Sequence, residues 1–262
     1  MEYVGGVPRL SVVIIAKNEA ARIGACLASV GFASERLVLD SGSTDATVAV
    51  AARAGARVVS TDWPGHVAQK NRGLLLARHP WVLSLDADER LSPQAAAEVQ
   101  ALLAGSPQAN GYSFPRRNTW LGTPLLHGRW YPDRKIRLVR RERARVVGTN
   151  PHDTLVVQGP VHRLGGDILH TPYQSLAEHL GTIDRYTRVQ AEHLHRAGLV
   201  ARWPDVWLRP PLRFIDAYLW RLGVLDGRAG LATSLLGAYY TGLKWSRLRA
   251  LNRLREGGQS AG

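Results

Sequence analysis

Short apolar runs that alternate with helix-like segments constrain the fold of the first 105 residues most strongly. Leu10–Ala16 (LSVVIIA) is continuously apolar and rich in β-branched residues, which is typical of a strand buried on both faces of a parallel sheet. Similar runs predict strands at 36–40, 57–60 and 82–85. Helices are expected at about 19–30, after Thr44, at 69–78 and at 93–104, with Asn18 and Ser92 as N-caps of the first and last. Strand and helix therefore alternate four times, which predicts an α/β fold with a parallel sheet.

Three carboxylates, Asp86, Asp88 and Glu89, follow the fourth apolar run. In open α/β sheets the ligand crevice lies outside the carboxyl ends of the strands, so these side chains are expected to face a ligand. Two carboxylates one residue apart can share Mg²⁺ or Mn²⁺, and such a cation would neutralise a diphosphate. A polar turn after a strand is the alternative explanation for a single Asp-x-Asp pattern.

Phosphate-binding loops of two common kinds are missing from the sequence. There is no GxxxxGK[ST] sequence and no GxGxxG after the first strand, which disfavours a P-loop NTPase and a dinucleotide-binding protein. Binding of a phosphorylated ligand would therefore depend on a metal ion or on arginine.

Four motifs in the first half, in order along the chain, resemble family 2 glycosyltransferases, which are inverting enzymes of GT-A fold. These motifs are SVVIIAKNEA, LVLDSGSTDAT, QKNRGL and WVLSLDADERL. The resemblance implies a GT-A, Rossmann-like mixed sheet and a nucleotide-sugar donor, usually a UDP-sugar, across the strand ends. It also implies Mg²⁺ or Mn²⁺ as cofactor, and it places the donor-binding residues by position: Ala16, Glu19, Asp40, Lys70 and Asp86.

Within that resemblance each acid has an expected role. Asp40 would accept a hydrogen bond from the base, Asp86 would touch the ribose or a metal-bound water, and Asp88 would bind the metal directly. Many relatives carry a second acid where this chain has Ser41. His170, with Asp86 and Asp88, is expected to complete the metal site, although a single histidine at a strand end is also a common structural residue.

The second half resembles bacterial lipopolysaccharide core β-glucosyltransferases through WYPDRKIRLVRR, NPHDTLVV and RPPLRFIDAYLWRLGVLDGRAGL. The likeness implies transfer of a hexose, with UDP-glucose as the donor, to an anionic lipid-linked oligosaccharide. An inverting displacement needs a general base, and Asp153 is the candidate for that role. His152 would orient Asp153 or serve as the base instead.

A basic, aromatic segment is the candidate acceptor-binding region. Between Arg116 and Arg145 the sequence holds ten basic and two acidic residues, which suits phosphates or anionic sugars. Trp130, Asp133 and Arg137 are the residues expected to bind the acceptor. A solvated basic strand face is the alternative explanation for any one arginine.

The charge of the chain is unevenly distributed. The net charge is +13, yet residues 1–100 hold 10 basic and 10 acidic residues, so the remaining 24 basic and 11 acidic residues carry the whole excess. A nucleic-acid-binding protein is one alternative, but no RNA-binding sheet signature or recognition helix is present, and no nucleic acid is expected as partner. A nucleotidyltransferase is another, disfavoured by the missing glycine-rich loop with lysine or arginine.

The predicted organisation is a catalytic domain at 1–195 followed by a basic amphipathic helical tail at 196–262. Within the catalytic domain, 1–105 is the nucleotide-sugar half and 106–195 the acceptor half. The single cysteine, Cys26, excludes an internal disulfide, and Glu2 and a short apolar run do not fit a signal peptide, so a cytoplasmic enzyme is expected. Tryptophan and arginine in the tail predict attachment to the inner face of the cytoplasmic membrane, with packing against the catalytic domain as the alternative.

Overall fold

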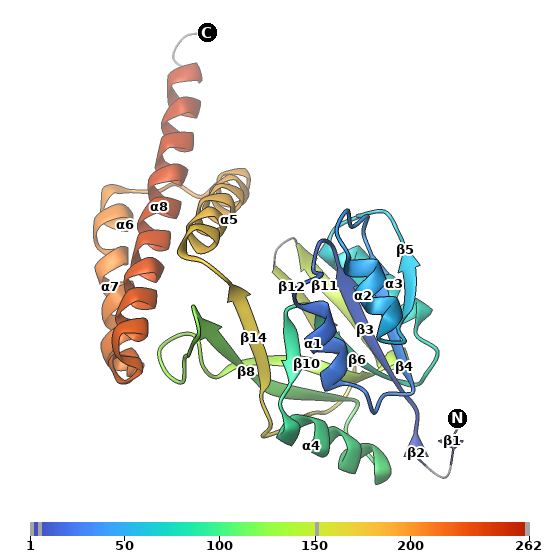
Figure 1. Cartoon of the computed structure of the whole chain (residues 1–262). Coiled ribbons are helices and arrows are strands. Elements are labelled where there is room, and N and C mark those ends of the chain that lie inside the picture. The colour runs from blue at the N-terminus through green and yellow to red at the C-terminus, as the bar shows by residue number, and fades with distance from the viewer. Residues whose placement is uncertain (1–2, 5–6, 150–151, 260–262) are drawn as a thin grey trace. The chain divides into compact units, whose positions relative to one another are not determined.

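The computed structural model describes residues 3–4, 7–149 and 152–259, which form two compact units (Figure 1). Unit 1 contains Met1–Arg117 and Asp133–Thr171, and unit 2 contains Asn118–Pro132 and Pro172–Gly262. The boundary expected after residue 195 falls at the end of α5 (Leu176–Arg196), a helix that belongs to unit 2 by its contacts.

A mixed sheet is the framework of unit 1, which confirms the predicted α/β class. Its helices are α1 (Ile23–Ser29), α2 (Thr47–Arg53), α3 (His66–Leu76) and α4 (Pro93–Ala104). The strands of the sheet are β3 (Leu10–Ala16), β4 (Glu35–Asp40), β5 (Arg57–Ser60), β6 (Trp81–Asp86), β7 (Glu89–Leu91), β8 (Gly111–Trp120), β9 (Thr123–Pro124), β10 (Asp133–Arg140), β13 (Val161–Arg163) and β14 (Ile168–Tyr173). Two short ribbons, β1 (Tyr3–Val4) with β2 (Val7–Pro8) and β11 (Ala144–Thr149) with β12 (His152–Val157), stand apart from it, and η1 (Arg141–Arg143) is a 3₁₀ turn.

The strand order is β5-β4-β3-β6-β10-β8-β14-β7, with β13 and β9 paired to β8. Strands β5, β4, β3 and β6 are parallel, whereas β10 is antiparallel to both β6 and β8. The four parallel strands therefore end at one edge, where the sequence places its acids.

Alternate residues of β3 face two apolar layers. Val12 and Ile14 pack with buried residues of α1, α2 and α4, while Val13 and Ile15 face α3 and the β11–β12 ribbon. Helix α3 lies very close to the sheet at Gly73, where a Cβ atom would come within 2.4 Å of a Val13 methyl group. This close approach brings the polar residues of α3 to the carboxyl edge of the strands.

The predicted elements agree with the structure best where local sequence decides. Strands β3 and β5 have the predicted bounds, and Ser92 Oγ accepts from Ala95 N (3.1 Å) as the N-cap of α4. The prediction that Asn18 caps the first helix is wrong, because α1 begins at Ile23. Asn18 has a φ of 56°, and its side-chain oxygen accepts from Thr44 N (2.8 Å) instead.

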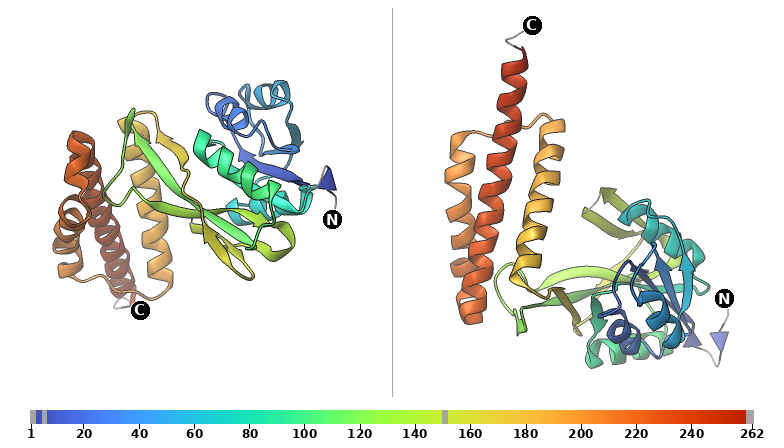
Figure 2. Two further views of the ribbon diagram at one scale, coloured as in Figure 1. Left: turned by 90° about the horizontal axis from the view of Figure 1, so that it is seen from below. Right: turned by 45° about the horizontal axis from the view of Figure 1, so that its top comes forward.

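Unit 2 is mainly helical, as expected for the end of the chain. It holds β9, α5, α6 (Trp203–Trp207), α7 (Arg209–Ile215), the π-helical segment η2 (Asp216–Trp220), the 3₁₀ segment η3 (Gly223–Asp226) and the long helix α8 (Gly227–Gln259). Helices α5 and α7 both pack along α8 (Figure 2). A small core forms around Trp245, Leu248, Ala191 and Ala201. Among the described residues, no helix is long and apolar enough to cross a membrane.

Candidate functional site

The carboxyl ends of three neighbouring strands bring the predicted donor-binding residues to one edge. In the strand register Ala16 pairs with Asp40, and Ile15 pairs with Asp86, so the last residues of β3, β4 and β6 lie side by side. Ala16 is buried, and Glu19 follows in the next loop, where its backbone N–H donates to Thr47 Oγ1 (2.7 Å). Parallel pairing therefore brings Ala16, Asp40 and Asp86 together, and Glu19 lies in the loop that follows β3.

Asp86 is held by two cations. Its Oδ1 lies 2.9 Å from Lys70 Nζ, and its Oδ2 lies 2.8 Å from Arg137 Nη2. Burial alone would raise the pKa of the Asp86 carboxyl, but the charges of Arg137 and Lys70 outweigh it and hold this pKa below its ordinary value. Because both oxygens already face a positive charge, the geometry suits contact with a ribose or a water better than direct ligation of a metal.

Lys70 joins Asp86 to the predicted general base. From α3 its Nζ donates to Asp153 Oδ2 (2.8 Å), and the lysine side chain is only 7% exposed. Asp153 lies on β12, which packs with β11 over α3. Since Lys70 takes one carboxylate oxygen, Asp153 Oδ1 is left without a hydrogen-bond partner among the described residues. His152 begins β12, but its side chain lies outside the described part of the chain.

A second set of buried charges lies behind Asp86. The Glu89 side chain is fully buried, and its Oε1 accepts from Arg137 (2.6 Å) and Arg116 (3.3 Å). Glu89 Oε2 also accepts from the Asp86 backbone N–H (3.2 Å), and Arg116 pairs with Asp133. Burial lowers the pKa of the Arg137 guanidinium, but Glu89 and Asp86 more than offset it, so this pKa is raised. Arg137 and Glu89 therefore hold Asp86 in place from the interior of unit 1.

Sequence reasoning missed the roles of Glu89 and Arg116. Glu89 follows the two aspartates directly, but the charged sequence DADER is typical of a solvent-exposed turn. Its partners are 27 and 48 residues away in the chain, so local sequence carries no signal of its burial. Arg137, expected at the acceptor, is buried in the same network.

Asp88 and His170 form a separate pair. Antiparallel pairing of β14 with β7 sets His170 opposite Glu89, and His170 Nε2 lies 3.2 Å from Asp88 Oδ2. Among the described residues, Asp88 pairs with no lysine or arginine, unlike Asp86. A carboxylate beside an imidazole is a donor set that Mn²⁺ accepts. Within the described ranges no group of three or more His, Cys, Asp or Glu residues is arranged so that it could hold a metal ion.

One carboxylate oxygen of Asp40 stabilises a turn, and the other has no described partner. Its Oδ2 accepts from the backbone N–H groups of Gly42 and Ser43, both at 3.1 Å. Its Oδ1 is buried and has no partner among the described groups. Ser41, which stands where many relatives carry an acid, accepts from Gln69 Nε2 (2.9 Å). A buried unpaired carboxylate oxygen favours a ligand N–H at this position.

Two of the predicted acceptor-binding residues lie in different units. Asp133 belongs to unit 1, where Arg116 and Lys135 bind its carboxylate. Trp130 belongs to unit 2, where it makes edge contacts with the rings of Tyr173 and His179.

Comparisons with known proteins show which family and which proteins the chain is similar to. The model of the family "Glycosyl transferase family 2" matches residues 11–158, more than half of the chain. The lipopolysaccharide core biosynthesis glycosyltransferase LpsC of Rhizobium meliloti (strain 1021) is 29% identical over 257 residues, covering 94% of each chain. An uncharacterized glycosyltransferase of Rickettsia bellii (strain RML369-C) is 27% identical, over 93% of this chain and 87% of the relative.

Among solved structures, the glucosyl-3-phosphoglycerate synthase of Mycobacterium tuberculosis in complex with Mn²⁺, UDP and glucosyl-3-phosphoglycerate is similar with a TM-score of 0.44. It is 22% identical, over 73% of this chain and 81% of that one. The expected α/β fold of GT-A type is confirmed by the mixed sheet and the family match together. The chain belongs to glycosyl transferase family 2.

Proposed function

We propose that the chain is an inverting, metal-dependent hexosyltransferase that moves a sugar, glucose by the likeness to its relatives, from a nucleotide sugar to a lipid-linked acceptor such as the lipopolysaccharide core. The observation that carries the proposal is the Asp153 carboxylate held by Lys70, which also holds Asp86 at the strand ends. Family membership favours sugar transfer over the nucleotidyltransferase and nucleic-acid-binding alternatives. The LpsC relative supports the choice of acceptor.

The donor would bind along the carboxyl edge of β3, β4 and β6. Asp40 Oδ1, buried and unpaired among the described groups, would accept from an N–H of the base, which uridine supplies. Asp86, fixed by Lys70 and Arg137, would meet the ribose or a bound water. Ala16 and Glu19 would border the nucleoside.

Asp88 and His170 would hold the divalent cation. The cation would supply positive charge to the diphosphate of the departing nucleotide. The chain's own part is to leave Asp88 without a described lysine or arginine partner, while Asp86 pairs with both Lys70 and Arg137. Two neighbouring carboxylates thereby have different tasks.

Asp153 would act as the general base. As the acceptor oxygen forms its bond to the anomeric carbon and the bond to the diphosphate breaks, the hydroxyl proton would pass to Asp153 Oδ1. Lys70 keeps the carboxylate in place through the other oxygen. Asp133 and Arg137 are engaged in internal ion pairs, so for the acceptor we propose the exposed basic residues of the part of this segment that belongs to unit 1.

Donor binding is tested by thermal unfolding with UDP, with and without Mn²⁺. A ligand at 100 times its Kd stabilises the folded state by about 2.7 kcal/mol, and we expect the Mn²⁺-dependent part of this gain to disappear in Asp88→Asn. Asp62→Asn is the matched control, since Asp62 is 74% exposed and pairs with Arg72 at the surface. Full Mn²⁺-dependent stabilisation of Asp88→Asn would reject the metal site.

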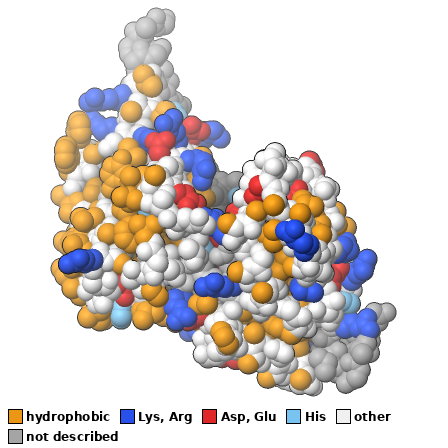
Figure 3. All heavy atoms as spheres, in the orientation of Figure 1, with side chains coloured by type: hydrophobic (Ala, Val, Ile, Leu, Met, Phe, Trp, Pro, Cys, Tyr) orange, Lys and Arg blue, Asp and Glu red, His pale blue; other side chains and the backbone are white. Residues whose placement is uncertain are grey.

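Unit 2 supports a second part of the proposal, attachment to the cytoplasmic face of the inner membrane. Figure 3 shows hydrophobic side chains grouped on the surface of this unit, near basic ones. Trp220 is 73% exposed, Trp207 69% and Leu225 63%. Tryptophan and leucine beside arginine suit the interface of an anionic bilayer, where each basic residue adds about 1 kcal/mol. A peripheral enzyme would thus meet a lipid-linked acceptor at the surface that carries it.

Vesicle sedimentation tests this attachment. We expect the protein to bind vesicles of phosphatidylcholine with phosphatidylglycerol, and Trp220→Ser with Leu225→Ser to weaken binding at least about tenfold through loss of apolar contact. Leu75→Ser is the matched control, because Leu75 is 82% exposed but lies on α3 of unit 1. Equal binding by all three proteins would exclude unit 2 as the attachment surface.

A further inference from the structure

Two basic side chains, Arg213 and Lys244, lie where α7 packs against α8 in unit 2. A Cβ atom at Gly242 of α8 would lie 3.3 Å from a ring carbon of Pro210, and one at Gly237 would lie 3.7 Å from Arg213 Nε, so the two helices are in close contact at both positions. Lys244 follows Gly237 by about two helical turns and therefore lies on the same face of α8. It is close enough to Arg213 for the two positive charges to repel each other.

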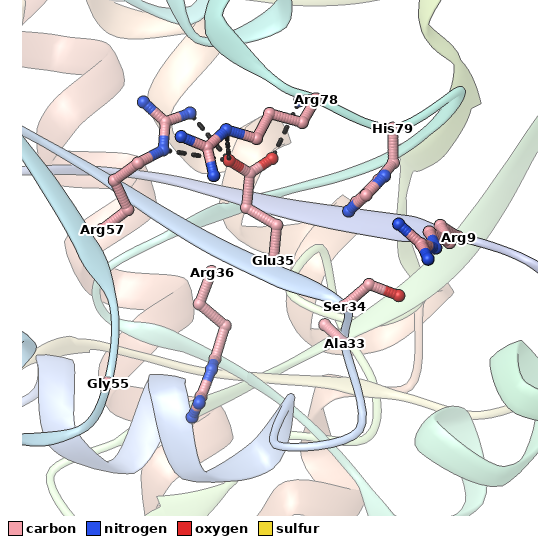
Figure 4. A pocket seen from close by; sticks show the side chains of 9 residues that line it. All are labelled: Arg9, Ala33, Ser34, Glu35, Arg36, Gly55, Arg57, Arg78 and His79. Atoms are coloured by element: carbon pink, nitrogen blue, oxygen red, sulfur yellow. Dashed lines mark hydrogen bonds and ion pairs between the residues drawn. The ribbon is translucent and has the colours of Figure 1, made fainter. Parts of the chain in front are cut away.

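A pocket in unit 1 shows how this chain usually places arginines near one another. Figure 4 shows the guanidinium groups of Arg57 and Arg78 directed at the Glu35 carboxylate, whose Oε1 lies 2.7 Å from Arg57 Nη2 and 3.7 Å from Arg78 Nε. Arg213 and Lys244 are half-buried, yet neither makes a hydrogen bond or an ion pair with any residue that the structure describes. The only printed neighbour of the Lys244 ammonium group is the Trp245 ring, whose centre lies 5.4 Å away. These two cations therefore lack the carboxylate that the arginines of unit 1 have.

The acid that acts on Arg213 is bound by other arginines. Asp216 raises the pKa of the Arg213 guanidinium, but its own carboxylate pairs with Arg129 and Arg221. Burial, followed by the charge of Arg129, outweighs Asp216 and lowers the pKa of Arg213 to about 10. Burial and repulsion from neighbouring arginines likewise lower the pKa of the Lys244 ammonium group. A bound anion would relieve this repulsion and replace the water that both cations lose on burial.

Two tyrosine hydroxyls add uncharged donors near these cations. Tyr240 on α8 and Tyr186 on α5 are half-buried, and neither hydroxyl has a hydrogen-bond partner among the described groups. Burial, with Tyr186 adding to its effect, raises the pKa of the Tyr240 hydroxyl, so this group keeps its proton and can donate. A guanidinium, an ammonium and a hydroxyl group together match the several oxygens of a phosphate.

Exposed leucines on α7 and just before it point to a phosphate that carries hydrocarbon chains. Leu212 directly precedes Arg213 and is 55% exposed, and Leu208, about one turn earlier, is 59% exposed. We propose that Arg213 and Lys244 bind the headgroup phosphate of an anionic phospholipid, with Tyr240 as a third donor and the two leucines against the lipid chains. The inference rests on the membrane attachment of unit 2 proposed above and assigns the headgroup contact within it.

Titration of the full chain with a short-chain phosphatidylglycerol, below the concentration at which it forms micelles, tests the site by calorimetry. We expect saturable binding to the wild type and a loss of affinity of about tenfold or more in Arg213→Gln/Lys244→Gln, because two charge-assisted donors are removed. Arg196→Gln/Arg228→Gln is the matched control, since it removes the same charge from two exposed arginines of unit 2 and should retain the wild-type affinity. Because Arg213 and Lys244 have no described partner, their double variant should also unfold at the wild-type temperature or above it.

Three results would overturn the assignment. Equal losses of affinity in the two double variants would mean that the lipid responds only to net charge. Inorganic phosphate that binds as tightly as the lipid and displaces it would assign the site to a soluble phosphate instead. A lower unfolding temperature of Arg213→Gln/Lys244→Gln would show that the two cations stabilise the fold through contacts of their own.

Vesicle sedimentation separates this inference from the attachment on which it rests. If the wild type sediments with phosphatidylglycerol vesicles but binds no short-chain lipid, the attachment holds and the headgroup site fails. If it binds the short-chain lipid but does not sediment with vesicles, the attachment fails and the headgroup site remains.

Discussion

The two units bury polar side chains in different ways. Unit 1 buries charged groups, namely Glu35, Asp40, Lys70, Glu89 and Arg137. Unit 2 buries mostly neutral types among its described residues, namely Asn118, His179, Thr187, Thr233 and Ser234, and its one described exception is the Asp226 side chain, which is 5% exposed and pairs with His127. Burying a charge is costly unless it is paired, and most of the buried charges in unit 1 have partners of opposite sign. The unit with the candidate catalytic residues is thus the one that carries most of this cost.

The comparison predicts different responses to acid. The pKa of Asp86 is held below its ordinary value of 3.8, so its contribution to stability is present above about pH 4 and is lost as the pH falls further. Burial lowers the pKa of His179 from 6.5 to about 4, so its neutral form is favoured in the folded state. The stability that depends on His179 is therefore complete above pH 6.5 and is lost between pH 6.5 and 4.

The largest effect is expected at Asp153, the candidate base held by the buried Lys70. Asp153→Asn removes the general base but keeps the size of the side chain, so turnover should fall by about 10²–10⁴-fold. Stabilisation by UDP with Mn²⁺ should remain, because Asp88, His170 and Asp40 are intact. Initial rates of sugar transfer and thermal unfolding are the two measurements. Retained turnover would show that another residue is the base and that the Lys70–Asp153 pair is not needed for sugar transfer.

The next effect is on the free energy of unfolding. Glu89→Gln leaves Arg137 and Arg116 with one charged partner fewer inside the protein, and breaking a buried pair costs about 3–5 kcal/mol. The free energy of unfolding, measured with urea, should fall by this amount. Glu142→Gln is the control, since Glu142 is exposed and should change stability by less than about 0.5 kcal/mol. Equal effects of both variants would mean that the buried charges of unit 1 are not coupled.

The backbone of unit 1 was predictable because its strands are specified locally. Leu10–Ala16 is apolar throughout, and the structure places a strand with the same bounds. Asp86 also lies where parallel pairing puts it, whereas Glu89, likewise expected to face a ligand, is buried against Arg137 and Arg116. Asn18 shows the limit, because its bond to Thr44, which lies 26 residues further along, replaces the expected helix cap.

The pairing of the charged side chains could not be predicted. Lys70 lies on a helix, where a lysine usually faces water, yet its partners Asp86 and Asp153 come from β6 and β12. Arg137 stands in a run of basic residues that is typical of a binding surface, but its side chain is buried and pairs with Glu89 and Asp86. These contacts depend on tertiary structure and cannot be predicted from local sequence patterns.

The smallest expected effect tests unit 2. His179 stacks on Tyr173 with ring centres 4.0 Å apart, and its Nδ1 accepts from Trp120 Nε1 (3.1 Å). In the unfolded chain His179 binds a proton below pH 6.5, whereas in the folded protein it does so only below about pH 4. The free energy of unfolding of the wild type should therefore fall by about 2 kcal/mol between pH 7 and pH 5 because of this residue. His179→Gln keeps an acceptor for Trp120 and removes the titration, so its unfolding free energy should depend less on pH by that amount.

His193→Gln, at an exposed position of the same helix, should retain the full dependence. An unchanged slope in His179→Gln would show that acid destabilises the protein through the paired charges of unit 1 instead, and the contrast between the two units in their response to acid would not hold.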